Sequence, residues 1–107
     1  MRSMLALSAV IFPLAAFASE DGLSFKVDNF ATDGDRSVLT IAVTNASTRS
    51  FRAVTMSCAF MNAEGRALDI GHANVSNIQP GETAWTQASI RGYAGIEKAQ
   101  CRFDNTL

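Results

Sequence analysis

Histidine and cysteine are scarce in this chain, which has one histidine and two cysteines among 107 residues. A Ser-His-Asp hydrolase needs an imidazole that a carboxylate orients. Asp69 is three residues from His72, so on a strand the two side chains would point to opposite faces. We therefore predict no catalytic residue and a protein that is not an enzyme, with His72 as a partly exposed strand residue.

The same scarcity argues against a metal or another cofactor, because a metal site needs several converging ligands. The acidic segment Asp33-Gly34-Asp35 lacks the length and spacing of a calcium loop and is typical of a solvated turn. Thioether sulfur is a soft ligand, however, so His72 with Met56 or Met61 could hold copper(I). A periplasmic copper carrier, or a small enzyme that uses His72, is therefore the alternative to the function predicted below.

Basic charge is neither abundant nor clustered. Nine Lys and Arg residues are balanced by ten Asp and Glu residues, for a formal net charge of −1. Binding to nucleic acid or to an anionic membrane surface would call for clustered basic side chains. We therefore expect no nucleic-acid partner.

The first residues have the three parts of a secretory signal peptide. Met1-Arg2 is a short, positively charged start, residues 4–17 are almost wholly apolar, and Ala16-Phe17-Ala18 has small residues where a signal peptidase reads them. The apolar stretch is shorter than the ~20 residues of a spanning helix. We expect cleavage between Ala18 and Ser19, which removes one arginine and changes the formal net charge from −1 to −2.

These features divide the chain into a signal peptide, residues 1–18, and a single domain, residues 19–107, since the remainder is too short for two domains. The signal peptide is typical of bacteria. We expect a periplasmic or secreted protein with no membrane span after cleavage.

Alternation of apolar and polar residues is the main pattern of the predicted domain, and it places one set of side chains on one face of a strand. Four runs show it clearly: Leu23, Phe25 and Val27; Leu39, Ile41 and Val43; Val54, Met56, Cys58 and Phe60; Ala99, Cys101 and Phe103. Residues 67–75 and 83–90 are predicted as two further, less regular strands. Turn residues separate the runs, and residues 105–107 are expected to be loose.

Short strands with turns at intervals of about ten residues are typical of antiparallel sandwiches. The pattern predicts an all-β fold, an antiparallel β-sandwich of about seven short strands. That the sandwich is immunoglobulin-like is implied by the family resemblance described below.

Cys58 and Cys101 are expected to pair, because an exported chain reaches an oxidising compartment. Both belong to the apolar set of their strands, and two inward-facing cysteines on different strands can meet across a core. We predict a buried inter-sheet disulfide that stabilises the fold. The alternative is a redox-active pair, but such pairs usually have the spacing C-x-x-C, whereas these cysteines are 43 positions apart.

Three signals follow one another in the order seen in a known family: Thr44-Asn45-Ala46-Ser47 after a strand, the turn Asn62-Ala63-Glu64-Gly65, and Ile78-Gln79-Pro80-Gly81-Glu82-Thr83 before a strand. Residues 37–103 thereby resemble the immunoglobulin-like FxLYD domains of exported bacterial proteins. The naming motif falls on residues 58–62, where cysteine, methionine and asparagine stand in place of the first aromatic residue, the tyrosine and the aspartate. The resemblance implies an extracytoplasmic β-sandwich without general catalytic residues.

Trp85 and Tyr93 are the one tryptophan and the one tyrosine of the chain. In immunoglobulin domains a tryptophan closely follows the first cysteine, whereas Trp85 follows Cys58 by 27 positions, so only the principle of a core disulfide carries over. We expect Trp85 in the core, although the phase of its strand is ambiguous. Because exposed aromatic residues often anchor binding, Trp85 and Tyr93 are also a possible binding surface.

Two asparagines, in Asn45-Ala46-Ser47 and Asn74-Val75-Ser76, match the glycosylation acceptor pattern. In a bacterial chain we expect these matches to be chance. A signal peptide, a single sandwich domain and no catalytic constellation together predict a small exported, non-catalytic module. Its expected partner is another protein or a cell-envelope component.

Overall fold

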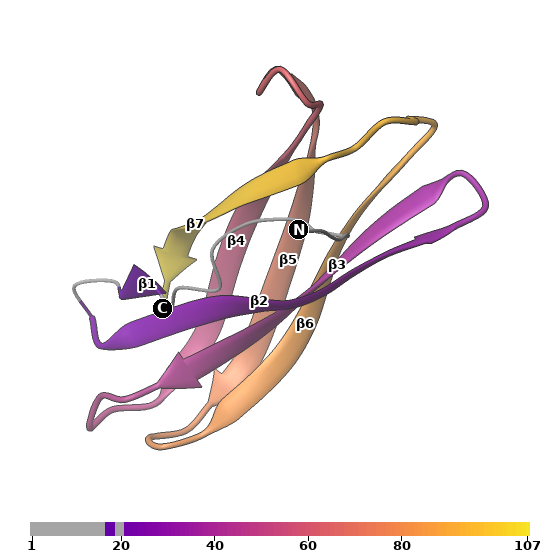
Figure 1. Ribbon diagram of the computed structural model, residues 1–107. Coiled ribbons are helices and arrows are strands. Elements are labelled where there is room, and N and C mark those ends of the chain that lie inside the picture. Colours follow the sequence, from indigo (N-terminus) through magenta and orange to yellow (C-terminus); the bar gives the residue numbers. More distant parts are fainter. Residues whose placement is uncertain (1–16, 19–20) are drawn as a thin grey trace.

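The computed structural model describes residues 17–18 and 21–107 as strands and turns, with no helix among them. Two antiparallel sheets pack face to face (Figure 1), with strand orders β1-β2-β3-β6 and β5-β4-β7. The strands are β1 Phe17–Ala18, β2 Leu23–Asp33, β3 Arg36–Asn45, β4 Phe51–Met61, β5 Ala67–Ile78, β6 Thr83–Arg91 and β7 Lys98–Thr106. The predicted all-β, antiparallel, two-layered fold is therefore confirmed. In the described part of the chain, no helix has the length and apolar character needed to cross a membrane.

Six strands of nine to twelve residues, β2 to β7, form the body of the two sheets. The expectation of about seven short strands is corrected to six long ones, because β2 to β7 each extend beyond the runs seen in the sequence. β1 adds only two residues, which pair with Ser24 and Phe25 at the edge of β2. It lies within the predicted signal peptide, so the expected cleavage would remove it. Residues 1–16 of that peptide, and Ser19, lie outside the described residues.

The core forms between the sheets from the residues that the alternation selects. The predicted inward sets of β2, β3 and β4 are buried, and β7 contributes buried Ala99 with the partly buried Cys101 and Phe103. The less regular strands β5 and β6 also alternate, and they bury Ala73, Val75, Ile78, Ala88 and Ile90. The predicted orientation of the regular strands is thus confirmed. Burial of each large apolar side chain contributes about 1.5–3 kcal/mol.

The sandwich is closed on one side by β5 and β6, which belong to different sheets. Thr86 Oγ1 on β6 donates to Asn74 O on β5 at 2.8 Å. A Cβ atom on Gly71 would lie 2.9 Å from Ser89 O and 3.1 Å from Phe60 Cε1. Only glycine therefore permits this close approach of the two strands.

On the opposite side, β2 and β7 are the facing edges of the two sheets (Figure 1). The Phe25 and Phe103 rings meet edge to face with centroids 5.2 Å apart. Thr106 Oγ1 donates to Asp21 Oδ2 at 2.8 Å, and Leu107 N donates to Ala53 O at 2.8 Å. The expectation that residues 105–107 are loose is wrong, because backbone hydrogen bonds to β4 continue to the last residue.

Cys58 and Cys101 form the predicted disulfide, but it does not join the two sheets. β4 and β7 are neighbours in one sheet, and the two cysteines are direct register partners with Cα atoms 4.0 Å apart. The inter-sheet prediction is therefore wrong, because alternation shows the face of a residue and not the sheet to which its strand belongs. Cys58 is fully buried, whereas Cys101 is half-buried because β7 is an edge strand.

Asn45 is a fully buried polar residue at the end of β3. Its side-chain Nδ2 donates to Arg49 O at 2.8 Å and to Ile78 O at 3.3 Å, and its Oδ1 accepts from the backbone N and the Oγ of Ser47. Its backbone N donates to Glu82 O and its backbone O accepts from Gly81 N. Asn45 thus joins the loop after β3 to the β5–β6 turn. The match to the glycosylation pattern here has a structural reason: Ser47 is the partner of the buried amide.

Candidate functional site

Trp85 lies on the outer face of the β1-β2-β3-β6 sheet, and its side chain is 62% exposed. On β6 the inward positions are Ala84, Ala88 and Ile90, so the odd-numbered residues point outward. The core position expected for Trp85 is therefore wrong, and its alternative place on the surface is correct. Small residues occupy the inward positions near Trp85 because β5 and β6 approach closely there.

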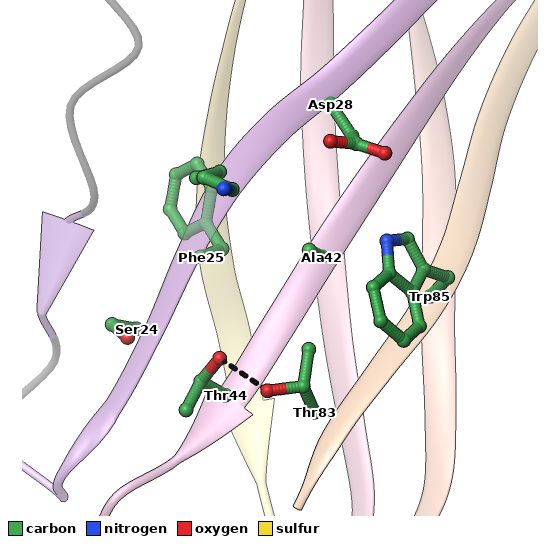
Figure 2. Close-up of a pocket in the computed structure, with 8 residues that line it drawn as sticks. Ser24, Phe25, Asp28, Ala42, Thr44, Thr83 and Trp85 are labelled. Carbon is green, nitrogen blue, oxygen red and sulfur yellow. Dashed lines mark hydrogen bonds between the residues drawn. The ribbon is translucent and has the colours of Figure 1, made fainter.

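Trp85 borders a hollow of about 370 Å³ on this face (Figure 2). The strand register places Lys26, Ala42 and Trp85 in one row across β2, β3 and β6. Ala42 is only 6% exposed although it faces outward, and its small side chain leaves room between its two larger neighbours. The lining residues are Ser24, Phe25, Lys26, Asp28, Ala42, Thr44, Thr83 and Trp85.

A β-bulge in β2 supplies the acidic group of the hollow. Val27 pairs with Ile41 and Asn29 pairs with the next residue back, Thr40, so Asp28 is the extra residue that has no partner in the ladder. Bulges commonly redirect side chains next to functional sites. Figure 2 shows the Asp28 carboxylate and the Trp85 indole on either side of β3.

The polar groups of the hollow are available to a ligand. Within the described part of the chain, the side chains of Lys26, Asp28 and Trp85 make no ion pair or hydrogen bond. The hydroxyl groups of Thr44 and Thr83 lie 2.9 Å apart and bond to each other. The hollow thus offers one cation, one anion, an indole N–H and hydroxyl groups, with no excess charge of either sign.

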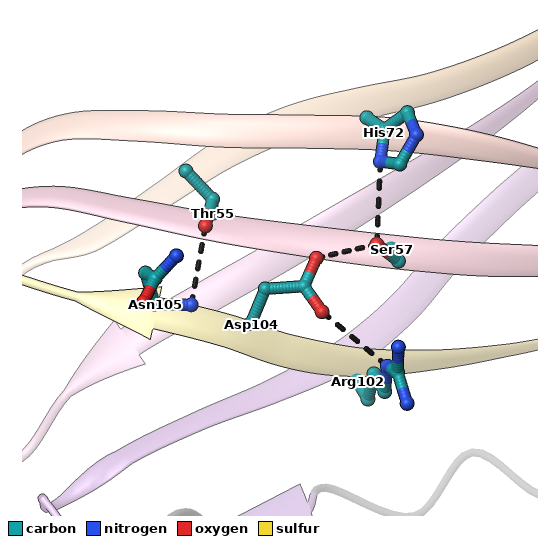
Figure 3. Close-up of polar contacts among 6 residues, drawn as sticks. All are labelled: Thr55, Ser57, His72, Arg102, Asp104 and Asn105. Atoms are coloured by element: carbon teal, nitrogen blue, oxygen red, sulfur yellow. Dashed lines mark hydrogen bonds and ion pairs between the residues drawn. The ribbon is translucent and has the colours of Figure 1, made fainter.

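A second polar cluster lies on the outer face of the other sheet, around His72 (Figure 3). Ser57 Oγ donates to Asp104 Oδ2 and lies 3.2 Å from His72 Nδ1. Arg102 Nε lies 3.3 Å from Asp104 Oδ1. No partner for His72 could be predicted from the sequence, because its contact with Ser57 depends on the register between β4 and β5. The predicted exposure of His72 is confirmed.

The order of the three groups differs from that of a hydrolase. Acyl transfer needs the imidazole between the serine and the carboxylate, whereas here Ser57 lies between His72 and Asp104. A serine hydroxyl has one proton. When Asp104 accepts it, His72 Nδ1 must be the donor to Ser57 Oγ, so His72 is not placed as a general base for Ser57.

The copper site considered for His72 is not assembled. Met56 is buried in the core, whereas His72 is exposed on the other face of the sheet. Met61 is four residues along β4 from Ser57, the register partner of His72, which corresponds to about 13 Å. Among the described residues, no three His, Cys, Asp or Glu side chains are grouped as metal ligands.

The acidic turn Asp33-Gly34-Asp35 connects β2 and β3. Its Asp35 forms an ion pair with Arg91, with Oδ1 and Nη1 3.3 Å apart.

Tyr93 is 40% exposed in the connection after β6, and it does not share a surface with Trp85. Trp85 is near the start of β6 and Arg91 is its last residue. Six residues of extended strand correspond to about 20 Å. The two aromatic residues of the predicted binding surface are therefore exposed but separate.

The hollow itself was not anticipated from the sequence, although one signal was present: the apolar spacing changes from two to three between Val27 and Phe30, which marks the bulge at Asp28.

The comparisons with known proteins add no further assignment. No protein-family model, curated protein or solved structure matches this chain.

Proposed function

We propose that this protein is a small exported, non-catalytic β-sandwich module that binds another protein or a cell-envelope component through the hollow beside Trp85. The observation that carries the proposal is the 62% exposure of the one tryptophan beside the side chains of Lys26 and Asp28, which make no ion pair or hydrogen bond within the described part of the chain. Tryptophan is enriched among the residues that dominate binding energy.

Export to the periplasm or the medium of a bacterium is part of the proposal. The signal peptide pattern of residues 1–18 and the Cys58–Cys101 disulfide support it, since disulfides persist in oxidising compartments. The resemblance to immunoglobulin-like FxLYD domains also belongs to the proposal, and the two-sheet architecture is compatible with it.

Processing of the full-length chain in a bacterial host is expected to yield a protein whose N-terminus is Ser19. The reason is the pair of small residues, Ala16 and Ala18, that a signal peptidase recognises. Intact-mass spectrometry of the periplasmic fraction and the medium measures the N-terminus directly. A full-length protein that retains Met1 and stays in the membrane fraction would contradict both the export and the predicted domain boundary.

Binding to the cell envelope is expected to depend on Trp85. Tagged protein produced from the full-length chain should co-sediment with purified bacterial envelope, and Trp85→Ala should lose at least about three-quarters of that binding, as expected for a central aromatic contact. Tyr93→Ala is the matched control, because it removes an exposed aromatic side chain at the far end of β6.

Both variants should melt like the parent protein, since neither side chain is in the core. An equal loss of envelope binding in Trp85→Ala and Tyr93→Ala would indicate nonspecific adhesion. Chemical cross-linking in intact cells tests for a protein partner in the same way. If the parent protein neither co-sediments with the envelope nor cross-links to a partner, the proposed function is overturned.

A further inference from the structure

We infer that the hollow beside Trp85 binds an uncharged sugar ring of an envelope glycan, with the ring stacked on the indole. This inference rests on the proposed function and names the class of its ligand. It follows from the shape, the charge and the hydrogen-bonding groups of the hollow.

The first argument is the free face of the indole. No aromatic ring or cation of the described residues stacks on Trp85. The face of an aromatic ring carries partial negative charge and attracts polarised hydrogen atoms. A pyranose ring presents several C–H groups on one flat side, so it matches this face in shape and in charge.

The second argument is the ring of polar groups around the indole. The Asp28 carboxylate can only accept hydrogen bonds, and the Lys26 ammonium and the indole N–H can only donate them. The Thr44 and Thr83 hydroxyls do both. A sugar has hydroxyl groups around its rim that donate and accept, so one ligand can satisfy all of these groups.

The charge of the hollow selects against ionic polymers. Lys26 and Asp28 are two residues apart on β2 and both line the hollow. Their opposite charges offset each other, so the hollow has no net charge that would attract a polyanion or a polycation. An uncharged ligand needs no such attraction.

The surroundings of Trp85 favour a sugar over a protein partner. The centre of a protein interface is depleted of charged residues and rich in apolar ones. Among the described residues that line the hollow, Ala42 is the only other apolar residue that faces outward, since Phe25 is buried in the core. The remaining large exposed apolar residues are elsewhere, with Ile70 on β5, Tyr93 after β6 and Leu107 after β7.

The size of the hollow agrees with this class of ligand. Its volume of about 370 Å³ is near the lower end of the range of ligand pockets, about 300–1,000 Å³. Such a volume suits a single sugar residue or the end of a short oligosaccharide.

The test uses Trp85 as its own reporter, because the chain has one tryptophan. Protein produced from the full-length chain is titrated with chitotriose, cellotriose, maltotriose and solubilised peptidoglycan fragments. At least one of these probes should shift the fluorescence emission to shorter wavelength in a saturable manner, because stacking removes water from the indole.

Calorimetry with the same probe then compares variants. Trp85→Ala should abolish measurable binding, and Asp28→Asn should weaken it about fivefold to tenfold, which corresponds to the loss of a charge-assisted hydrogen bond. Tyr93→Ala should bind like the parent, and thermal melts confirm that each variant is folded.

The outcomes separate this inference from the proposed function. If envelope binding depends on Trp85 but none of the four probes binds or competes, the glycan inference fails and the proposed function stands. Sugar binding that persists in Trp85→Ala also overturns the inference, because it must occur elsewhere. If a probe binds through Trp85 but envelope binding is absent, the inference stands and the proposed envelope function fails.

Discussion

Replacement of both cysteines by alanine is expected to lower the free energy of unfolding by about 2–5 kcal/mol, the usual cost of losing a disulfide in a small exported domain. The bond closes a loop of 43 positions, and the chain-entropy relation gives about 4 kcal/mol for a loop of that length. Domains of this size have about 5–15 kcal/mol in total. The Cys58→Ala/Cys101→Ala variant should therefore be close to unfolding at growth temperature.

Urea unfolding of the oxidised protein, the reduced protein and the double variant measures this effect. Reduced parent and double variant should agree to within about 1 kcal/mol, since the alanines add only the loss of two small buried groups. Thiol labelling of the folded, unreduced parent should find no free cysteine. If the reduced protein is as stable as the oxidised one, the bond is dispensable for folding and the redox alternative for this pair gains weight.

Replacement of Asn45 by alanine is expected to cost about 2–4 kcal/mol, because it removes four side-chain hydrogen bonds at a buried site. The loss should be concentrated where the loop after β3 meets the β5–β6 turn. Hydrogen exchange of the Ala46 and Gly81 amides should accelerate more than that of amides in the middle of β4.

Two substitutions calibrate this result. Ser47→Ala should cost only about 0.5–1.5 kcal/mol, because it removes one hydrogen bond of the Asn45 amide and two exposed bonds to Arg49, and leaves the other three bonds of that amide in place. Asn74→Ala removes the asparagine of the second acceptor pattern, whose side chain is exposed, and should change stability by less than about 0.5 kcal/mol. Equal effects at positions 45 and 74 would contradict the proposed role of the buried amide.

Alternation in the sequence was sufficient to predict which residues of the four regular runs face the core. Burial sets the phase of a strand strongly, because a shift by one residue would expose the whole apolar set. Leu39, Ile41 and Val43 are fully buried, as that argument requires. The partner strands are not specified in this way, so Cys58 and Cys101 were correctly paired but assigned to different sheets.

The candidate site depended on features that the pattern of single strands does not contain. Trp85 faces outward because Ala84, Ala88 and Ile90 occupy the inner side of β6, a phase that the irregular pattern of this strand did not show. Asp28 belongs to the outward set of β2, but its place in the same hollow as Trp85 depends on the register of β2, β3 and β6. Ser57 and Asp104 lie near His72 only after three strands are placed in register. Each case requires long-range geometry, which local periodicity does not supply.

The covalent loop also determines how the molecule responds to tension. It contains all of β5 and β6 and parts of β4 and β7, so it includes strands of both sheets. When the chain is pulled from residues outside the loop, the segment between Cys58 and Cys101 cannot be drawn out. Its 43 residue steps correspond to about 150 Å of extended chain. A module under load would thus lengthen mainly by releasing β2, β3 and the first half of β4. The segment within the disulfide loop would not extend under the applied force.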